Sequence, residues 1–527
     1  MTPTSRLKVS LVYFGTTNSY FGFRKIAAIA ANKCICSVYI VNTGNLFSIL
    51  SVLKTKKGTD SFKSEDIKLI AETFGQSDIL CVSSMSEEAL IVKEILREVR
   101  INKPEIFLLW GGIHPIVSPE DAIDSDVDAI CTSEGEAAFS EFIDCFYDEE
   151  KRLGVRNFWF RNGGEIIKNP FRPLLTSNDL NDFPPPFFGD NEYVFERSVG
   201  FRLGNINDYL KSNALSYNTI WTRGCPFKCT YCSNTKFLEN DKLAGRVRHA
   251  SVDTLITEIK LILRDRPFIQ SISFHDDCFL ALDISILTEF SKQWRKEVGL
   301  PFAVHGITPV HVNEEKLVIL AEAGLKRIRM GVQSGSDRIL KFYKRPNQKG
   351  LLQKAFGIIS RVQNGMVPPA YDVIVDNPFE NDDDVQATIL MVNSMPRPFT
   401  LNIFSLRSIP GTTLDYQLKN IESRCEPIGN NNYGNLAPTL ANVMLFFVAT
   451  FRVPDMILGR LLRHAHSYHH SGNRFPRLLM AISILFYVKR AFQHLMSFDF
   501  SVVFGKFGFF LWKMRLLGRQ HGKKFLS

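Results

Sequence analysis

The first 150 residues alternate short apolar runs with amphipathic stretches. Several runs are rich in β-branched and aromatic residues and end at polar loops, the pattern of buried strands. The predicted strands are 8–14, 79–83, 106–110 and 127–131. Helical periodicity separates them, as in 87–99 and 137–146. Strands alternating with helices predict an α/β, doubly wound (Rossmann-like) domain over residues 1–150, which binds ligands at the carboxyl ends of its strands.

Residues 151–213 read as a connecting segment. A hairpin is predicted over 158–167, because Asn162-Gly163 tolerates the positive φ of a tight turn. Three successive prolines, 184–186, then mark a linker, since they continue neither a helix nor a central strand.

The βα rhythm resumes over residues 214–425. Six strand-like runs there predict a partial (β/α)6 barrel, whose chemistry belongs at the carboxyl ends of the strands. The predicted strands are 219–222, 271–274, 302–305, 327–332, 371–375 and 401–406.

The last segment, 426–527, is basic, apolar and mainly helical by its pattern. Thirteen Lys/Arg and two Asp/Glu lie from Leu436 onward, a net charge of +11, so the remainder carries −2 of the total +9. Its apolar stretches, 444–451, 478–488 and 500–511, fall short of the eighteen uncharged residues of a spanning helix. Two roles stay open: helices that cap the barrel, which we favour, and amphipathic helices on an anionic membrane surface.

Three cysteines within eight residues, Cys225, Cys229 and Cys232, are the strongest chemical signal. Thiolates hold iron–sulfur clusters, and a four-iron cube takes four of them, so a loop that supplies three leaves one iron for a small molecule. A structural zinc site needs four ligands and usually a second Cys pair, which the chain lacks, although His249 is a distant fourth candidate. A disulfide framework belongs to small secreted domains, and we see no signal peptide.

The spacing C-x3-C-x2-C, with Gly224 before it and Tyr231 inside it, resembles the radical S-adenosylmethionine (SAM) enzymes. This resemblance implies a [4Fe–4S] cluster on the three cysteines, which would act as catalytic and metal-binding residues. Its free iron would chelate SAM, and reductive cleavage would yield a 5′-deoxyadenosyl radical.

Later motifs follow the order of that family, so the resemblance also implies SAM-binding positions. The F-x-D-D-x-F run resembles the family branch with an added cobalamin domain. Gln333 stands where many relatives have Glu. The SAM-binding positions implied are Tyr231, Asp276, Asp277, Arg329, Gln333, Ser334, Pro410 and Gly411.

The first domain is similar to cobalamin-binding domains, since its Ser- and Gly-rich loops match those that hold the nucleotide tail. The lower-ligand motif D-x-H-x-x-G is absent, which implies cobalamin without a protein histidine below the cobalt. The alternative is an empty scaffold or a nucleotide-binding domain. The cobalamin-binding positions implied are Thr16, Thr17, Asn18, Ser83, Ser84, Gly111, Gly112, His114, Glu134, Gly135 and Glu136.

The sequence therefore predicts a cobalamin-dependent radical SAM methyltransferase that methylates an unactivated carbon of a small-molecule or lipid-like substrate. We expect a cytoplasmic monomer, with peripheral membrane contact left open, an electron donor such as flavodoxin or ferredoxin, and no nucleic-acid partner. Two alternatives remain: a radical cyclase or rearrangement enzyme that uses cobalamin without methyl transfer, and a non-catalytic cluster-binding or membrane-docking protein.

Overall fold

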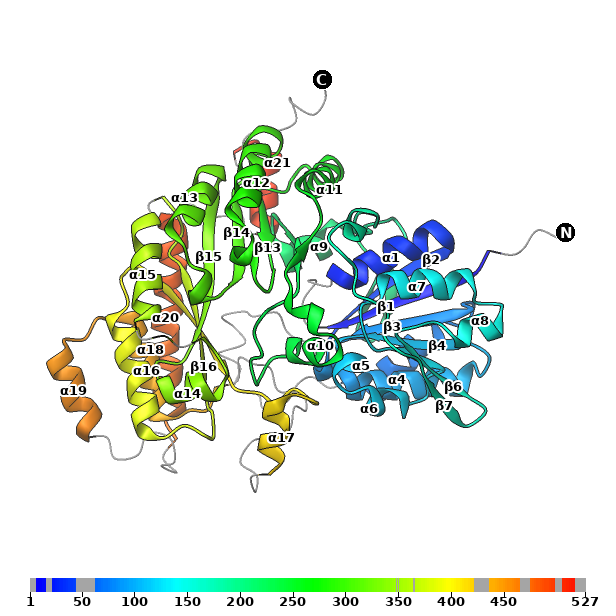
Figure 1. The fold of residues 1–527 in the computed structure, drawn as a ribbon, viewed down its shortest axis with the longest axis horizontal. Coiled ribbons are helices and arrows are strands. Elements are labelled where there is room, and N and C mark those ends of the chain that lie inside the picture. Colours follow the sequence, from blue (N-terminus) through cyan, green and yellow to red (C-terminus); the bar gives the residue numbers. More distant parts are fainter. Residues whose placement is uncertain are drawn as a thin grey trace.

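The structure is a computed structural model of the chain. It describes residues 6–15, 21–43, 62–346, 348, 350–363, 365–420, 436–464, 474–497 and 505–516. Figure 1 shows the blue and cyan N-terminal sheet on one side and the green and yellow barrel strands on the other, with the orange and red C-terminal helices along the barrel. The predicted fold class is confirmed.

The N-terminal part is one nine-stranded sheet with helices on both faces. Its parallel centre has the order β2-β1-β3-β4-β5, which is that of a flavodoxin-like doubly wound sheet. The full order is β7 (Glu165–Lys168), β6 (Phe158–Asn162), β5 (Ala129–Cys131), β4 (Phe107–Gly112), β3 (Ile79–Ser84), β1 (Lys8–Gly15), β2 (Ile35–Asn42), β8 (Glu192–Glu196) and β9 (Gly200–Leu203).

The helices of this part follow the strands in chain order. They are α1 (Phe21–Lys33), α3 (Ser64–Glu72), α4 (Ala89–Asn102), α5 (Ile113–Val117), α6 (Pro119–Ile123), α7 (Glu136–Asp144) and α8 (Glu149–Leu153). The hairpin predicted around Asn162 is confirmed as β6 and β7. Strands β2, β8 and β9 were not predicted, although the Val-Tyr-Ile-Val run of β2 is an ordinary strand signal.

The second sheet has six parallel strands. They are β10 (Ser216–Thr219), β13 (Ser271–Phe274), β14 (Phe302–Ile307), β15 (Leu325–Gln333), β16 (Ala370–Val375) and β17 (Thr400–Ser405), in that spatial order. The prediction of a first barrel strand over 219–222 was wrong. Asp276 accepts backbone N–H groups after Thr219, and Thr222–Arg223 forms the short strand β11, which pairs with β12 (Arg248–His249).

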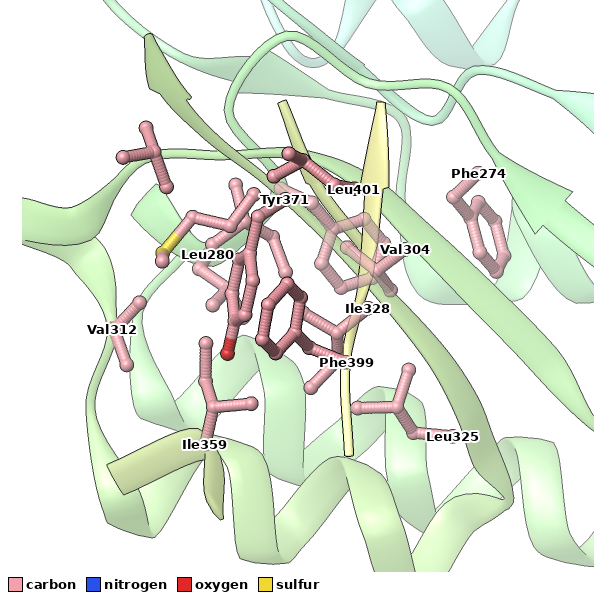
Figure 2. Close-up of a cluster of buried hydrophobic side chains, with 14 of the residues drawn as sticks. Phe274, Leu280, Val304, Val312, Leu325, Ile328, Ile359, Tyr371, Phe399 and Leu401 are labelled. Carbon is pink, nitrogen blue, oxygen red and sulfur yellow. The ribbon is translucent and has the colours of Figure 1, made fainter. Parts of the chain in front are cut away.

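Helices follow the strands of this part in chain order, and several of them pack on one face of the sheet. They are α9 (Ile206–Asn213), α10 (Asn234–Asn240), α11 (Val252–Asp265), α12 (Ile284–Glu297), α13 (Glu314–Ala323), α14 (Asp337–Phe342), α15 (Leu351–Val362), α16 (Asp382–Ser394) and α17 (Thr413–Lys419). Figure 2 shows the side chains of Phe274, Val304, Ile328, Tyr371 and Leu401, one from each of five neighbouring strands, gathered in the hydrophobic core. Burial of these faces fixes the strand register, and with it the polar residues at the strand ends.

The C-terminal segment consists of α18 (Leu440–Thr450), α19 (Asp455–His464), α20 (Pro476–Met496) and α21 (Gly505–Lys513). Apolar residues of α18 and α20 belong to the same hydrophobic cluster as the barrel. Lys489 on α20 donates to the carbonyl of Thr450 at 2.8 Å, which satisfies the C-terminal end of α18. These contacts fit the capping role.

Helix α20 is, within the described ranges, the one helix long and apolar enough to cross a membrane by length and composition alone. The sequence analysis expected no such stretch. Ile482 and Phe486 are buried against the barrel side, whereas Val488 and Phe492 on the same helix are more than half exposed. Packing on the barrel therefore accounts for one face of this helix.

Candidate active site

The cysteine loop lies between β11 and α10, beyond the carboxyl ends of the barrel strands. Cys229 is buried, and Cys225 and Cys232 are partly exposed. Gly224 enters the loop with φ of +97°, and a Cβ there would lie 2.3 Å from the carbonyl oxygen of Arg246. Only glycine can approach that carbonyl so closely, which explains sterically why a glycine stands before the first cysteine.

The thiols share an electrostatic environment. Nη1 of Arg345 lies 3.7 Å from Sγ of Cys229, and its Nη2 donates to the carbonyl of Gly331 at 2.7 Å. A hydrogen bond from Cys278 lowers the pKa of Cys225, whereas burial raises the pKa of Cys232 to about 12. Thiolates are the ligand form, and a cation beside the loop favours them.

The donor set fits a cluster better than a single ion. Within the described part of the chain, no three His, Cys, Asp or Glu side chains converge closely enough to hold one metal ion. Thiolates on a cube bind different irons and need not meet at one point, unlike the four ligands of a structural zinc. Three thiols on one loop therefore suit a [4Fe–4S] cluster.

The two adjacent aspartates differ in their surroundings. Asp276 is buried and accepts the backbone N–H groups of Trp221 and Thr222, and burial raises its pKa to about 7. Burial also raises the pKa of Asp277, whose negative charge in turn raises the pKa of Cys232. Asp276 thus holds the strand that leads to the loop, and Asp277 lies beside the thiols.

The residues at the end of β15 form a tightly constrained turn. Gln333 has φ of +74°, a conformation that costs energy in a non-glycine residue. Ser334 is fully buried, and its Oγ lies 3.2 Å from Oγ1 of Thr388 on α16. Arg329, four residues earlier, instead pairs with Asp372 on β16.

Tyr231 and Gly411 have packing partners. The ring of Tyr231 meets that of Tyr343 edge-on, with centroids 5.0 Å apart. Gly411, which follows Pro410, has φ of +75°, and a Cβ there would lie 2.1 Å from the carbonyl oxygen of Val117 in the N-terminal part. This glycine permits the two parts of the molecule to touch.

The predicted N-terminal loops lie at the carboxyl ends of β3, β4 and β5. Gly112 has φ of +90°, and a Cβ there would lie 2.6 Å from the carbonyl oxygen of Ser84. Gly111 follows the same strand, and the hydroxyl of Ser84 accepts from Trp110 at 3.0 Å. Ser83, next to it, is partly exposed, so this end of the sheet is glycine-lined and close-packed. Thr16, Thr17 and Asn18 lie outside the described residues.

Three other predicted residues of this domain are engaged by neighbouring side chains. The ring of His114 is buried, with its two nitrogens 2.9 Å from Asp121 and 3.2 Å from Ser86. Glu136 pairs with Arg223 at 2.5 Å and Glu134 with Arg248 at 2.7 Å, both across the domain boundary, with Gly135 between them. Burial by itself would raise the pKa of Glu136, but the Arg223 charge outweighs it and holds that pKa below its usual value. These carboxylates bind the barrel.

Some residues of the site escaped the sequence analysis. Arg345 belongs to no recognisable sequence motif. It lies near Cys229 only because the turn after α14 brings it there. His275 and His305 end adjacent strands, and their rings stack with centroids 4.2 Å apart and planes 9° from parallel. His305 was expected to be a satisfied histidine, but its Nδ1 is buried and has no hydrogen-bond partner among the described residues. That expectation was wrong. Stacking on His275 occupies the face of the ring but gives Nδ1 no hydrogen-bond partner among the described residues.

An open cavity of about 670 Å³ borders the cysteine loop. Five of its nine lining residues are basic and one is acidic. The lining residues are Pro226, Phe227, Lys228, Asp337, Arg338, Lys341, Lys344, Arg345 and Pro346.

Comparison with known proteins agrees with this geometry. Residues 219–392, from the end of β10 to α16, match the family model of the radical SAM superfamily. The match covers the barrel segment that carries the three-cysteine loop. Enzymes of that superfamily use a [4Fe–4S] cluster and SAM, and they need an electron donor and a substrate.

Two curated relatives are methyltransferases. One, from Pyrococcus horikoshii, is an uncharacterised methyltransferase that is 26% identical over 354 residues, covering 65% of this chain and 69% of the relative. The other is cytidylyl-2-hydroxyethylphosphonate methyltransferase of Streptomyces wedmorensis, 26% identical over 322 residues, covering 54% of the chain but only 56% of the relative.

A solved structure shares the fold over nearly the whole chain. It is the radical SAM methyltransferase TsrM from Kitasatospora setae, solved with cobalamin and a [4Fe–4S] cluster bound. The TM-score is 0.59 at 12% identity, covering 92% of this chain and 99% of TsrM. The likeness extends from the barrel to the N-terminal sheet, and it concerns the fold alone.

Proposed function

We propose that this radical SAM enzyme is a cobalamin-dependent methyltransferase that methylates an unactivated carbon of a small molecule. The observation that carries the proposal is a three-thiol loop at the open end of a polar barrel, docked against a flavodoxin-like sheet. The methyltransferase relatives and the shared fold with a cobalamin-containing structure support it.

In this proposal Cys225, Cys229 and Cys232 hold the cluster, and Arg345 stabilises their negative charge. When bound, the cluster supplies the electron that cleaves SAM, and cobalamin supplies the methyl group. Asp277 lies beside the thiols, as expected of an acceptor for the SAM amino group. The remaining SAM-binding positions proposed are Tyr231, Gln333, Ser334, Pro410 and Gly411.

We further propose that the glycine-lined ends of β3 and β4 hold the cobalamin tail. A Cβ at Gly112 would strike Ser84, so glycine lets the two strand ends pack closely, and Gly111 and Gly112 are both partly exposed there. Ser83 is the partly exposed hydroxyl at this edge. Glu134, Glu136 and His114 instead serve the structure through the partners described above.

The electron donor is proposed to be an acidic protein such as flavodoxin or ferredoxin. The basic cavity borders the cysteine loop, so a donor bound there lies near the proposed cluster. Complementary charge speeds such encounters and orients the partner. An enzyme with this cofactor set belongs in a reducing compartment, which we take to be the cytoplasm.

The test is anaerobic reconstitution of the full chain with iron, sulfide and hydroxocobalamin, followed by reduction in the presence of SAM carrying a labelled methyl group. We expect bound cobalamin, formation of 5′-deoxyadenosine and transfer of the label to a molecule in a cell extract. Cys229→Ala should abolish 5′-deoxyadenosine and retain cobalamin, because the two cofactors are held by separate domains.

The outcomes separate the alternatives. Formation of 5′-deoxyadenosine with a mass change other than a methyl group in the product would identify a cyclase or rearrangement enzyme. No SAM cleavage by a protein that has assembled its cluster would identify a non-catalytic role. Cys145→Ala is the matched control, since this partly exposed cysteine lies in the N-terminal part, outside the three-thiol motif.

A further inference from the structure

The interior face of the barrel is polar and partly accessible. Along β15, the residues that join the hydrophobic core are fully buried, whereas the alternate residues that face the interior are only partly buried. On β17 the same alternation runs from Leu401 to Ser405, whereas on β16 it runs from Ala370 to Val373 and Ile374 is buried. The interior residues in question are Arg327, Arg329, Gly331, Gln333, Asp372, Asn402 and Phe404. A barrel filled by apolar layers would bury both faces, so this one keeps room for a ligand.

A chain of polar contacts crosses this interior. Nε of Arg329 lies 2.9 Å from both carboxylate oxygens of Asp372. The side-chain Nδ2 of Asn402 donates to Asp372 at 2.7 Å. The side-chain Oδ1 of Asn402 accepts a hydrogen bond from Arg490 of α20 at 3.0 Å. Asp372 therefore bonds one guanidinium group directly and is linked to a second one through Asn402. The terminal nitrogens of Arg329 make no hydrogen bond to any residue that the structure describes.

Two imidazoles border the same space. His275 and His305 stack beside Arg329, and burial followed by the Arg329 charge lowers the pKa of His275 to about 4. The pKa of His305 is also lowered, by burial and by the charges of His275 and Arg329. Both rings are therefore neutral at physiological pH, and the partnerless Nδ1 of His305 is available for a hydrogen bond with a ligand.

We propose that Arg329, Arg490 and His305 form an anion-binding site in the barrel, which receives a phosphate or phosphonate group of the substrate. This inference rests on the proposed function, in which the barrel interior holds the substrate. The single carboxylate of Asp372 lies near both guanidinium groups, so positive charge remains in this partly buried site, and a bound oxyanion balances it through charge-assisted hydrogen bonds. Arg327, on the same face of β15, adds to the positive potential.

The site is separate from the proposed SAM position. Arg329 precedes Gln333 by four residues, about 13 Å along a strand at about 3.3 Å per residue, so it lies deeper in the barrel than the strand end. Arg490 comes from the C-terminal helix, far from the cysteine loop in sequence, and contacts β17. The C-terminal segment thus both caps the barrel and completes its binding surface.

The test measures binding of inorganic phosphate to the full chain by calorimetry, with sodium chloride at equal ionic strength as the blank. We expect saturable binding that is weakened at least about tenfold in Arg490→Gln and in Arg329→Gln, as for loss of a charge-assisted hydrogen bond. Arg477→Gln, an equal charge change at an exposed position of α20, is the matched control and should bind like the unmodified protein. Arg490→Lys should fall between, because it keeps the charge without the planar fork.

Several results would overturn the proposal: no binding by the unmodified chain, equal binding by Arg490→Gln, or displacement of SAM by phosphate, which would assign the anion site to the SAM carboxylate. Far-ultraviolet circular dichroism checks that each variant is folded. If Arg490→Gln does not fold, Arg490→Lys still tests the proposal. Phosphate binding needs no cluster. A chain that binds phosphate but never cleaves SAM would refute the proposed function and support the anion site.

Discussion

At the scale of the residue, identical neighbours in the sequence have different roles. Asp276 and Asp277 are equivalent in a motif, but the backbone turns one carboxylate toward the amides of Trp221 and Thr222 and leaves the other beside the thiols. The sequence predicted that carboxylates belong at this strand end. It does not tell which of the two carboxylates accepts the backbone N–H groups, because that depends on the residue at which β10 ends.

Asp276→Ala should destabilise the protein by about 1–3 kcal/mol, because two backbone N–H groups lose a buried acceptor. Asp277→Asn should leave the free energy of unfolding nearly unchanged and weaken SAM binding. Chemical denaturation and equilibrium dialysis with labelled SAM measure the two effects. Equal loss of stability in both variants would contradict this division of roles.

At the scale of the element, short segments after the strands shape the surface of the site. Helix α14 follows the turn after β15 and, with the cysteine loop, lines the basic cavity. Helical periodicity identifies neither feature, because a charged face on a short helix is normally just solvated. Lys341 on α14 and Lys344 just after it have a proposed role only because this segment lies beside the cysteine loop.

Lys341→Glu combined with Lys344→Glu should slow SAM cleavage driven by reduced flavodoxin about tenfold or more at low salt, because an attractive surface becomes repulsive. The rate with dithionite, a small chemical reductant, should change little. Lys354→Glu, exposed on α15, is the control. Rates that fall equally with both reductants would show that the variant damages the active site itself.

At the scale of the whole molecule, ion pairs join the two sheets. Glu136 and Glu134, at the carboxyl edge of the N-terminal sheet, pair with Arg223 and Arg248, which flank the cysteine loop in sequence. Lys25 on α1 adds a pair with Glu258 on α11 at 2.7 Å. These contacts hold the proposed cobalamin face against the barrel, an arrangement that brings two cofactors within reach of one substrate.

Arg223→Ala should lower the free energy of unfolding by about 3 kcal/mol, near the lower end for breaking a buried pair, since it strands the buried Glu136. Adding Glu136→Gln should recover part of this loss by removing the unpaired charge. Denaturation of both variants measures the difference. No recovery in the double variant would mean that the pair contributes through packing alone.

The sequence by itself determined the cysteine loop, the order of strands and the fold class. These follow from ligand spacing and from side-chain periodicity, which are properties of neighbouring residues. It gave the strands of the barrel core to within a few residues, and it missed β2 and misplaced β10.

Only the tertiary structure decided which polar groups meet. Asp372, Asn402 and Arg490 come together because two strands share a register and a helix more than eighty residues later packs against the same barrel. Glu134 and Glu136, predicted as cofactor-binding residues, also form ion pairs across the domain boundary, because the fold brings Arg248 and Arg223 beside them. Long-range packing determines which residues become partners, and local sequence patterns contain no information about that packing.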